Sequence, residues 1–247
     1  MIKSGEHMKR VILTGSSSGI GLATAQALLE RGYEVISLAR RPCPLRADGI
    51  RSVLVDLTDA DATRQAALEI AAETPATTIV HCAGAIREKP LEDVQSADLL
   101  ALSNLHIVAA VSLVQANLPA MKAAHFGRII LISTRAVLGL AKRTAYASTK
   151  AGMLGLARTW ALELAPHGVT ANVVAPGPIA DTEMFEEIIP VGSPKAMAAA
   201  RQIPVGRFGT PGDVARAVMF FADPEASFIT GQTLFVCGGT SVGSIVY

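Results

Sequence analysis

The feature that most constrains the fold is an alternation of short apolar runs with longer amphipathic segments. The short runs are rich in valine and isoleucine and are apolar almost throughout, as expected for strands covered on both faces. They lie at residues 10–15, 34–39, 52–56, 77–82, 128–133, 170–175 and 233–237. Helical patterns lie between them, near 19–31, 59–72, 92–124, 145–165 and 212–222. This alternation predicts right-handed βαβ units and an α/β fold, with a doubly wound parallel sheet of about seven strands and helices on both faces.

No low-complexity linker or internal repeat divides this pattern, so residues 9–247 are predicted to form a single domain. Residues 1–8 are polar and are interpreted as a leader or a disordered start. The irregular stretch 176–204 contains several prolines and two short helical patterns, at 182–189 and 194–202. Long insertions in compact domains are usually functional, so this stretch is predicted to be a substrate lid.

Charge and composition exclude several classes of protein. Twenty-two basic and twenty-one acidic side chains leave a formal charge of +1, which argues against a nucleic-acid surface. The apolar run 99–114 is shorter than the roughly 20 residues of a membrane span and is predicted to be a buried helix. Cys43, Cys82 and Cys237 form no recognisable disulfide framework or metal site, which favours a reducing, cytoplasmic location.

A glycine-rich loop, "TGSSSGIG", directly follows the first predicted strand and opens the first helix. Gly15, Gly19 and Gly21 give the spacing G-x-x-x-G-x-G, which departs from the common G-x-G-x-x-G pattern. Glycines at this place let the backbone approach a pyrophosphate, whose charge is favoured at a helix N-terminus. The alternative is a tight connection without a ligand. The position after the first strand favours dinucleotide binding.

The end of the second predicted strand indicates which dinucleotide is bound. An acidic residue at this place normally bonds the ribose 2′-hydroxyl of NAD, but here the strand ends in Ala39, followed by Arg40 and Arg41. A guanidinium pairs well with a 2′-phosphate. The two arginines could instead be solvated loop residues, but the missing acid favours NADP(H).

The segment "TAYASTK" places Tyr146 and Lys150 four residues apart in a chain with only three tyrosines. On a helix, residues i and i+4 share one face, so the phenol and the ammonium would lie side by side. A neighbouring cation favours phenolate and lowers the pKa of a phenol. We therefore expect Tyr146 to donate and accept a proton near neutral pH. The pair alone is a weak signal and needs its context.

Several motifs follow one another in a characteristic order. These are "TGSSSGIG" (14–21), "DLTD" (56–59), "CAGA" (82–85), Asn104, Ser133, "YASTK" (146–150), "PGPIADT" (176–182) and the stretch 206–239. In this order the chain resembles the short-chain dehydrogenase/reductase family over nearly its whole length. It is similar to bacterial members that resemble 3-oxoacyl-acyl-carrier-protein reductase. The resemblance implies a single-domain Rossmann fold.

The resemblance also implies roles for individual residues. Tyr146 would exchange a proton with the carbonyl or alcohol oxygen, and Lys150 would lower its pKa and bind the nicotinamide ribose. Ser133 would hold the carbonyl oxygen, and Asn104 would distort a helix and anchor a water molecule. The implied cofactor-binding residues are Gly15, Ser17, Ser18, Gly19, Ile20, Gly21, Arg40, Arg41, Asp56, Leu57, Cys82, Ala83, Gly84, Tyr146, Lys150, Pro176, Gly177, Ile179 and Thr182.

Three residues depart from the family pattern. Cys82 replaces the usual asparagine at the end of strand four, so this edge is expected to be looser or rewired. Cys237 replaces an aspartate of structural importance near the end of the chain. Arg135 stands two residues after Ser133, where it could clamp a substrate carboxylate or point to solvent. His81, His106 and His125 match no motif and are expected to be packing or surface residues.

The leading functional prediction is an NADP(H)-dependent oxidoreductase that interconverts a ketone and a secondary alcohol, with Ser133, Arg135 and Tyr146 toward the substrate. One alternative substrate is a 3-oxoacyl thioester on acyl carrier protein, for which Lys142 and Arg143 are candidate basic residues at the cleft mouth. A second alternative is a dinucleotide-binding regulator without turnover. The predicted helices at 92–124 and 145–165 are rich in alanine and leucine, so we expect a homotetramer built by their pairing. No metal, nucleic acid or membrane is expected as a partner.

Overall fold

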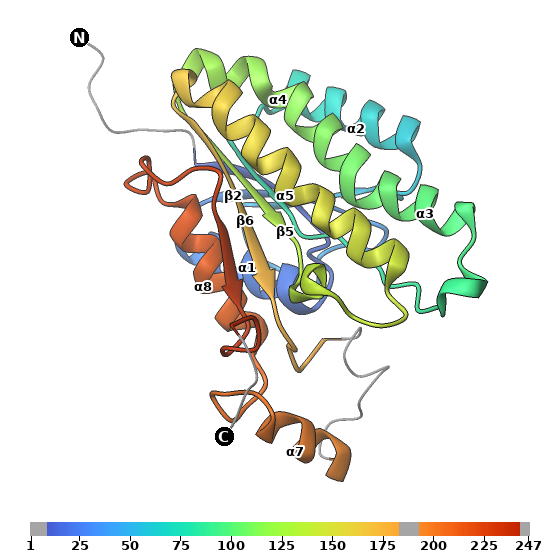
Figure 1. Cartoon of the computed structure of the whole chain (residues 1–247). Coiled ribbons are helices and arrows are strands. Elements are labelled where there is room, and N and C mark those ends of the chain that lie inside the picture. The colour runs from blue at the N-terminus through green and yellow to red at the C-terminus, as the bar shows by residue number, and fades with distance from the viewer. Residues whose placement is uncertain (1–8, 183–192, 243–247) are drawn as a thin grey trace.

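The computed structural model describes residues 9–182 and 193–242. Its seven strands form one parallel sheet in the order β3-β2-β1-β4-β5-β6-β7 (Figure 1). The strands are β1 Arg10–Thr14, β2 Glu34–Ala39, β3 Ile50–Leu54, β4 Thr78–His81, β5 Gly127–Ile132, β6 Val169–Pro176 and β7 Thr233–Val236. The predicted doubly wound parallel sheet is confirmed. The strand order reverses between β1 and β4, which is the switch point where ligands bind in such folds.

Helices cover both faces of the sheet (Figure 1). The α-helices are α1 Gly19–Glu30, α2 Ala60–Glu73, α3 Ser96–Ser103, α4 Ala109–Ala124, α5 Thr144–Leu164, α7 Pro194–Arg201 and α8 Pro211–Ala222. Shorter helical turns are η1 Leu91–Asp93, η2 Asn104–Val108, η3 Arg135–Leu138 and η4 Ala165–His167. Helices α1 and α8 pack side by side on one face, and α2, α4 and α5 cover the other.

Alternation along the strands divides the core into two layers. In β1, Ile12 points to the layer under α2, α4 and α5, whereas Val11 and Leu13 point to the layer under α1 and α8. All three side chains are fully buried, because both faces of a central parallel strand are covered by helices. This arrangement explains why most of the strands read as continuous apolar runs in the sequence.

Two predicted elements differ from the structure. The third strand runs over Ile50–Leu54 instead of 52–56, because β3 is an edge strand whose register is fixed by β2, with Val35 opposite Ile50. Its Arg51 and Ser52 side chains are exposed, so its sequence lacks the apolar pattern of the central strands. The single helix predicted at 92–124 is interrupted by the π-helical turn η2 and preceded by the turn η1. The pattern at 182–189 and the predicted leader at 1–8 lie outside the described residues, apart from Thr182.

The continuous helical segment Ser96–Ala124 is long and apolar enough to cross a membrane by length and composition alone, which is weak evidence. Its Leu102, Leu113 and Met121 side chains are almost completely buried in the core under α2 and α5. The prediction of a buried helix therefore agrees with the packing of this segment.

Arg128, near the start of β5, is buried at the amino ends of the strands, opposite their carboxyl ends. Its guanidinium donates to the carbonyl oxygens of Gly127 and Pro224 at 2.8 Å, of Asp223 at 3.2 Å and of Gly168 at 3.3 Å. It also lies 4.3 Å from the centre of the Phe126 ring. One side chain thereby joins β5 to the ends of α8 and η4.

Candidate active site

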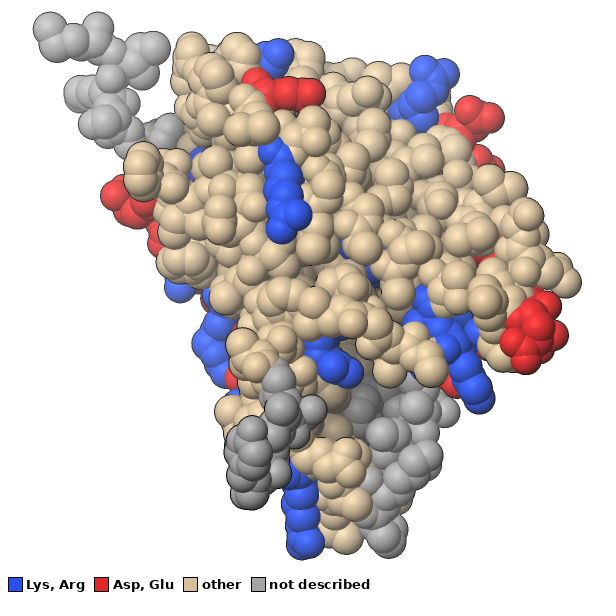
Figure 2. Space-filling view, viewed as in Figure 1, with Lys and Arg blue, Asp and Glu red and all other residues tan. Residues whose placement is uncertain are grey.

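A cleft of about 790 Å³ lies at the carboxyl ends of the strands. In the space-filling view a hollow opens between the body of the domain and its lower part, with Lys and Arg side chains at its rim (Figure 2). All the predicted site residues except Asn104 line this cleft. They are Gly15, Ser17, Ser18, Gly19, Ile20, Gly21, Arg40, Arg41, Asp56, Leu57, Cys82, Ala83, Gly84, Ser133, Arg135, Tyr146, Lys150, Pro176, Gly177, Ile179 and Thr182. Their individual roles stay predictions.

The glycine loop forms a cradle between β1 and α1. Gly15 has a φ of +72°, and a Cβ atom there would lie 2.8 Å from Ala83 Cα. A Cβ atom on Gly21 would lie 2.0 Å from the carbonyl oxygen of Gly15. Side chains are therefore excluded at both positions, which brings bare backbone to the N-terminus of α1. Thr182 lies against the same loop, because a Cβ atom on Gly19 would meet its Cγ2 at 3.1 Å.

The far end of the cleft is lined by Arg40, Arg41 and Asp56. Hydrogen bonds from the backbone and side chain of Thr58 lower the pKa of Asp56, and the charge of Arg40 adds to this effect. No carboxylate follows β2 where NAD-dependent proteins carry one, since Ala39 occupies that place. The glycine cradle and the two guanidiniums fit a dinucleotide with a 2′-phosphate.

The opposite wall of the cleft is formed by the end of β5 and the first turns of α5. Lys150 is buried, and its ammonium donates to the carbonyl oxygen of Ile132 at 2.7 Å. Ser133 Oγ donates to the carbonyl oxygen of Lys150 at 2.8 Å, which fixes the serine against the helix. Tyr146 lies one helical turn before Lys150 on the same face of α5, as the spacing predicts.

The expected effect of Lys150 on the tyrosine is not found in this structure. Burial raises the pKa of Tyr146 above that of a free phenol, while a hydrogen bond with Thr134 and the charge of Arg143 act in the opposite direction. Burial also lowers the pKa of Lys150 to about 8. This structure does not support the expectation that the lysine brings the phenol toward neutral pH, because the ammonium is held at Ile132 and burial disfavours its charge.

Asn104 begins the π-helical turn between α3 and α4. Its Nδ2 donates to the carbonyl oxygen of Thr58 at 3.0 Å, across 46 residues of sequence. The helix is therefore distorted at Asn104. The side chain joins it to the loop after β3, and Leu105 beside it lines the cleft.

The end of β4, where Cys82 stands, is held by hydrogen bonds to its backbone and to His81. Thr14 Oγ1 accepts hydrogen bonds from the backbone N–H groups of Cys82 at 3.0 Å and Ala83 at 2.9 Å. Its own proton then goes to His81 Nδ1 at 3.0 Å, and His81 Nε2 donates to the carbonyl oxygen of Leu105 at 2.9 Å. Burial lowers the pKa of His81 to about 3, so the ring is neutral and suits this arrangement. Four hydrogen bonds thus hold this end of the strand, which does not support the expectation of a looser edge.

His106 also belongs to the framework of the site. Thr149 Oγ1 donates to the carbonyl oxygen of Ala145 at 2.8 Å, so His106 Nδ1 donates to Thr149 at 2.9 Å. Its Nε2 accepts from the backbone N–H of Ala85 at 3.4 Å, and burial keeps its pKa well below the usual range. The ring packs edge-on against Tyr146 with a centroid distance of 5.8 Å. His106 therefore joins the 82–85 loop to α5.

His81 and His106 were expected to be packing or surface residues. Both are buried, but they also make hydrogen bonds that the sequence did not indicate. The only local signal is a polar residue at the end of an apolar strand and another within an apolar helix. Their partners lie 21 to 67 residues away in the sequence, so the contacts could not be derived from local spacing. His125 ends α4 in a left-handed conformation and is exposed, as expected for a surface residue.

Arg135 lines the cleft, and its Nη1 donates to the carbonyl oxygen of Thr240 at 3.4 Å. Cys237 is buried nearby, where a Cβ atom on Gly177 would approach its Cα to 2.8 Å, and its thiol donates to Ser241 Oγ at 3.1 Å. The segment after β7 therefore lies beside the cleft and contacts both Arg135 and the 176–182 loop.

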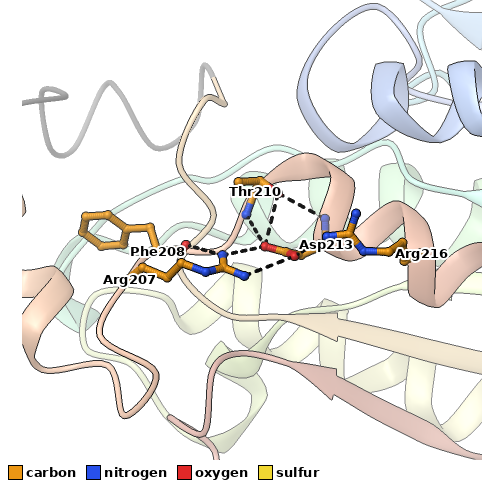
Figure 3. A network of polar contacts seen from close by, with 5 residues as sticks. All are labelled: Arg207, Phe208, Thr210, Asp213 and Arg216. Carbon is orange, nitrogen blue, oxygen red and sulfur yellow. Dashed lines mark hydrogen bonds and ion pairs between the residues drawn. The ribbon is translucent and has the colours of Figure 1, made fainter.

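The loop before α8 supports the same side of the cleft. Asp213 accepts hydrogen bonds from Arg207 and Arg216 at 2.7 Å and from the backbone N–H of Thr210 at 2.9 Å (Figure 3). The Arg207 guanidinium holds the pKa of Asp213 well below its usual range. Gly209, inside this loop, exchanges backbone hydrogen bonds with the segment after β6, at Pro178 and Ala180. The network thus orders the wall formed by residues 178–180.

Within residues 9–182 and 193–242, no group of three or more His, Cys, Asp or Glu side chains is placed to hold a metal ion. A cleft at the switch point of such a sheet, with a glycine cradle on one side and Ser133, Tyr146 and Lys150 on the other, defines the class of nicotinamide-dependent oxidoreductases.

Known proteins resemble this chain along most of its length. The family described as Enoyl-(Acyl carrier protein) reductase matches residues 15–241. The 3-oxoacyl-acyl-carrier-protein reductase MabA of Mycobacterium avium is 36% identical over 240 residues, covering 95% of this chain and 91% of the relative. Aldohexose dehydrogenase of Thermoplasma acidophilum is 28% identical with a TM-score of 0.87, covering 96% of each chain. A blue fluorescent protein from a metagenomic library, in complex with NADPH, is 28% identical with a TM-score of 0.81, covering 95% of this chain and 98% of that one.

The chain belongs to the short-chain dehydrogenase/reductase family. The predictions of an oxidoreductase of this family and of NADP(H) as its cofactor are confirmed.

Proposed function

We propose that the protein interconverts a ketone and a secondary alcohol by hydride transfer, with Ser133, Tyr146, Lys150 and Asn104 as its site. The observation that carries this proposal is the shared cleft, in which Ser133, Tyr146 and Lys150 face the glycine cradle. A serine, a phenol and an ammonium on one wall supply what reduction of a carbonyl needs besides the cofactor, namely a hydrogen-bond donor for the oxygen and a proton.

When bound, NADP(H) supplies or accepts the hydride at its nicotinamide ring. Arg40 and Arg41 lie where the 2′-phosphate would be held, and the cradle around Gly15 and Gly21 lies where the pyrophosphate would be. Lys150 would bind the nicotinamide ribose, and Thr182, which lies against Gly19, would meet the carboxamide.

Ser133 and Tyr146 would act on the substrate oxygen. The Ser133 proton now points to the carbonyl oxygen of Lys150, and turning it toward the cleft would let the serine hold a substrate carbonyl. Tyr146 would give its proton to that oxygen in reduction and remove it in oxidation. Asn104 would act through the π-helical turn that it begins, which sets the position of Leu105 at the cleft and of His106 against Tyr146.

The substrate end of the cleft favours a substrate with an anionic group. Arg135 and Lys142 line it, and Arg135 is bonded only weakly to Thr240 in this structure. We therefore propose Arg135 as a clamp for a substrate carboxylate. Residues 176–204 would close over the bound substrate as a lid, of which residues 183–192 lie outside the described structure.

A 3-oxoacyl thioester on acyl carrier protein is the second candidate substrate, because MabA, at 36% identity, is named as a reductase of that substrate. Of the two basic residues expected at the cleft mouth, Lys142 is exposed, but Arg143 is buried and paired with Glu88. This pairing removes one of the two charges on which a docking surface for an acidic carrier protein would depend.

We also propose that the protein is a cytoplasmic homotetramer. Exposed leucines on the two helical segments support pairing across a two-fold axis, since Leu100 on α3 is 66% exposed and Leu162 on α5 is 82% exposed. Light scattering at micromolar concentration tests this assembly, and a monomer would contradict it.

The central test is a turnover screen with NADPH and NADP⁺ against ketones, secondary alcohols, oxo acids and 3-oxoacyl thioesters. The wild type should turn over at least one of them, and Tyr146→Phe should lose roughly 10²–10⁴-fold in rate with NADPH affinity retained. A variant that keeps more than about a tenth of the rate would contradict the assignment of the tyrosine. Binding of NADPH without turnover of any substrate would instead support a non-catalytic regulator.

A further inference from the structure

Arg143 is a buried cation immediately before the helix that carries Tyr146. It is the N-cap of α5, and its carbonyl oxygen accepts a hydrogen bond from Ala147 N at 2.7 Å. Tyr146 lies three residues further along, in the first turn of that helix. Only 7% of the Arg143 side chain is exposed, and both residues line the cleft.

The partner of Arg143 is Glu88, on the loop between β4 and α3. Arg143 Nη1 lies 2.5 Å from Glu88 Oε2, and the Glu88 side chain is 46% exposed at the cleft. The backbone of the two segments is joined as well, since Lys89 N donates to the carbonyl oxygen of Lys142 at 3.1 Å. The ion pair is therefore held by a backbone contact beside it.

The same loop is fastened at its other end. The buried carboxylate of Asp98, in the first turn of α3, accepts hydrogen bonds from Arg87 and Lys89 at 2.8 Å each and from Gln95 N at 3.1 Å. Residues 87 and 89 are thus anchored on both sides of Glu88. The Glu88 side chain is half exposed at the cleft, and the anchored residues on either side of it fix its position.

Several charged or titratable groups line the cleft or pack around Tyr146. They are Lys150 from α5, Lys142 and Arg143 just before it, Glu88 from the loop after β4, Cys82 at the end of β4, His106 from η2, Arg135 from η3 and, after β2 and β3, Arg40, Arg41 and Asp56. His106 is neutral, and burial raises the pKa of the Cys82 thiol to about 12, so neither supplies a charge near neutral pH. The Arg135 guanidinium is directed to the carbonyl oxygen of Thr240.

Lys150 cannot supply the charge either when the phenol ionises in the cofactor-free protein. Burial lowers the pKa of Lys150 to about 8 and raises that of Tyr146, so both effects favour loss of the lysine proton before that of the phenol. A guanidinium keeps its charge throughout this pH range. Arg143 is therefore the cation that remains beside the phenol.

We propose that Arg143 and Glu88 together set the ionisation of Tyr146, with the guanidinium favouring phenolate and the carboxylate weakening that effect. The functional meaning of this positioning pair rests on the proposed proton transfer by Tyr146. Because Glu88 is held beside Arg143 by the anchored loop, its carboxylate offsets part of the field of the guanidinium at the phenol.

The test measures the ionisation of Tyr146 directly and needs no substrate. Protein labelled with ¹³C at tyrosine Cζ has three signals, and that of Tyr146 is the one missing in Tyr146→Phe. Its titration is followed in the wild type, Arg143→Gln and Glu88→Gln, with and without NADP⁺. The three proteins are compared at each pH at which circular dichroism shows all of them folded. The ionised fraction of Tyr146 should be highest in Glu88→Gln, intermediate in the wild type and lowest in Arg143→Gln.

The ionised fraction of Tyr146 should shift in opposite directions in Arg143→Gln and Glu88→Gln. Structural damage alone would not give opposite shifts according to the sign of the charge that is removed. Arg143→Lys keeps the cation and should titrate close to the wild type. Arg158→Gln removes an exposed arginine three turns further along α5 and should cause no shift. Equal ionised fractions in Arg143→Gln, Glu88→Gln and the wild type, including fractions too small to detect, would overturn the proposal. Failure to find a substrate would affect only the proposed function.

Discussion

Replacement of the buried Lys150 by methionine should stabilise the cofactor-free protein at pH 7. Burial lowers the pKa of Lys150 from 10.5 to about 8, and each pH unit of difference between folded and unfolded states corresponds to about 1.4 kcal/mol. Keeping the ammonium charged in the core therefore costs about 3 kcal/mol of unfolding free energy at pH 7. Methionine has a similar unbranched shape and carries no charge.

The variant also loses a favourable contact. The hydrogen bond from Lys150 to the carbonyl oxygen of Ile132 is 2.7 Å long, and leaving that oxygen unpaired costs about 1–2 kcal/mol. The net gain is therefore about 1–2 kcal/mol, which in a chain of this length raises the Tm by about 2–8 °C. Such a gain at the expense of an active-site residue is a typical trade-off between stability and activity.

The pH dependence of this gain identifies its cause. Between pH 8 and 10.5 the lysine is protonated in the unfolded chain but not in the folded one, so the stability of the wild type rises with pH in this window. The advantage of Lys150→Met is complete below pH 8, decreases through the window and changes sign near its upper end, where only the lost hydrogen bond remains.

Thermal unfolding of cofactor-free protein, followed by circular dichroism at pH 7 and pH 9.5, measures both effects. Lys122→Met serves as the matched control, because Lys122 is an exposed lysine in the last turn of α4. Its Tm should follow that of the wild type at both pH values. A Lys150→Met protein that is less stable than the wild type at pH 7, or whose Tm difference is the same at both pH values, would refute the reasoning.

Three further outcomes are expected. We expect the wild type to prefer NADP(H) over NAD(H) by at least about tenfold in affinity, as measured by titration calorimetry. Arg40→Asp should reverse this preference, whereas Arg46→Asp, at an exposed arginine, should leave it unchanged. Gly21→Ala should weaken NADPH binding severely, because its Cβ atom would lie 2.0 Å from Gly15 O; unchanged affinity would contradict the cradle. Arg128→Met should lower the unfolding free energy by about 3 kcal/mol in urea, because four backbone carbonyl oxygens lose their donor; a change under about 1 kcal/mol would show that water replaces the guanidinium.

The positions of the strands along the chain and the glycine-rich loop could be predicted because their signals are local. The central strands are mostly apolar, since both of their faces are covered, and β2 begins and ends at the predicted residues, 34 and 39. The glycines at 15, 19 and 21 follow β1 directly because a side chain at 15 or 21 would collide with backbone. The edge strand β3 was displaced by two residues because its exposed Arg51 and Ser52 weaken the apolar pattern.

The sequence by itself determined the parallel α/β class, the dinucleotide cradle, the absence of an acid after β2 and the Tyr146–Lys150 spacing on one helical face. Only the tertiary structure decided what surrounds that pair, because those contacts join distant parts of the chain. It placed Glu88 against Arg143, Thr149 against His106 and the ammonium of Lys150 on Ile132. Spacing along a helix can bring a cation beside a phenol, but burial and long-range partners determine which cation keeps its charge there and where it points.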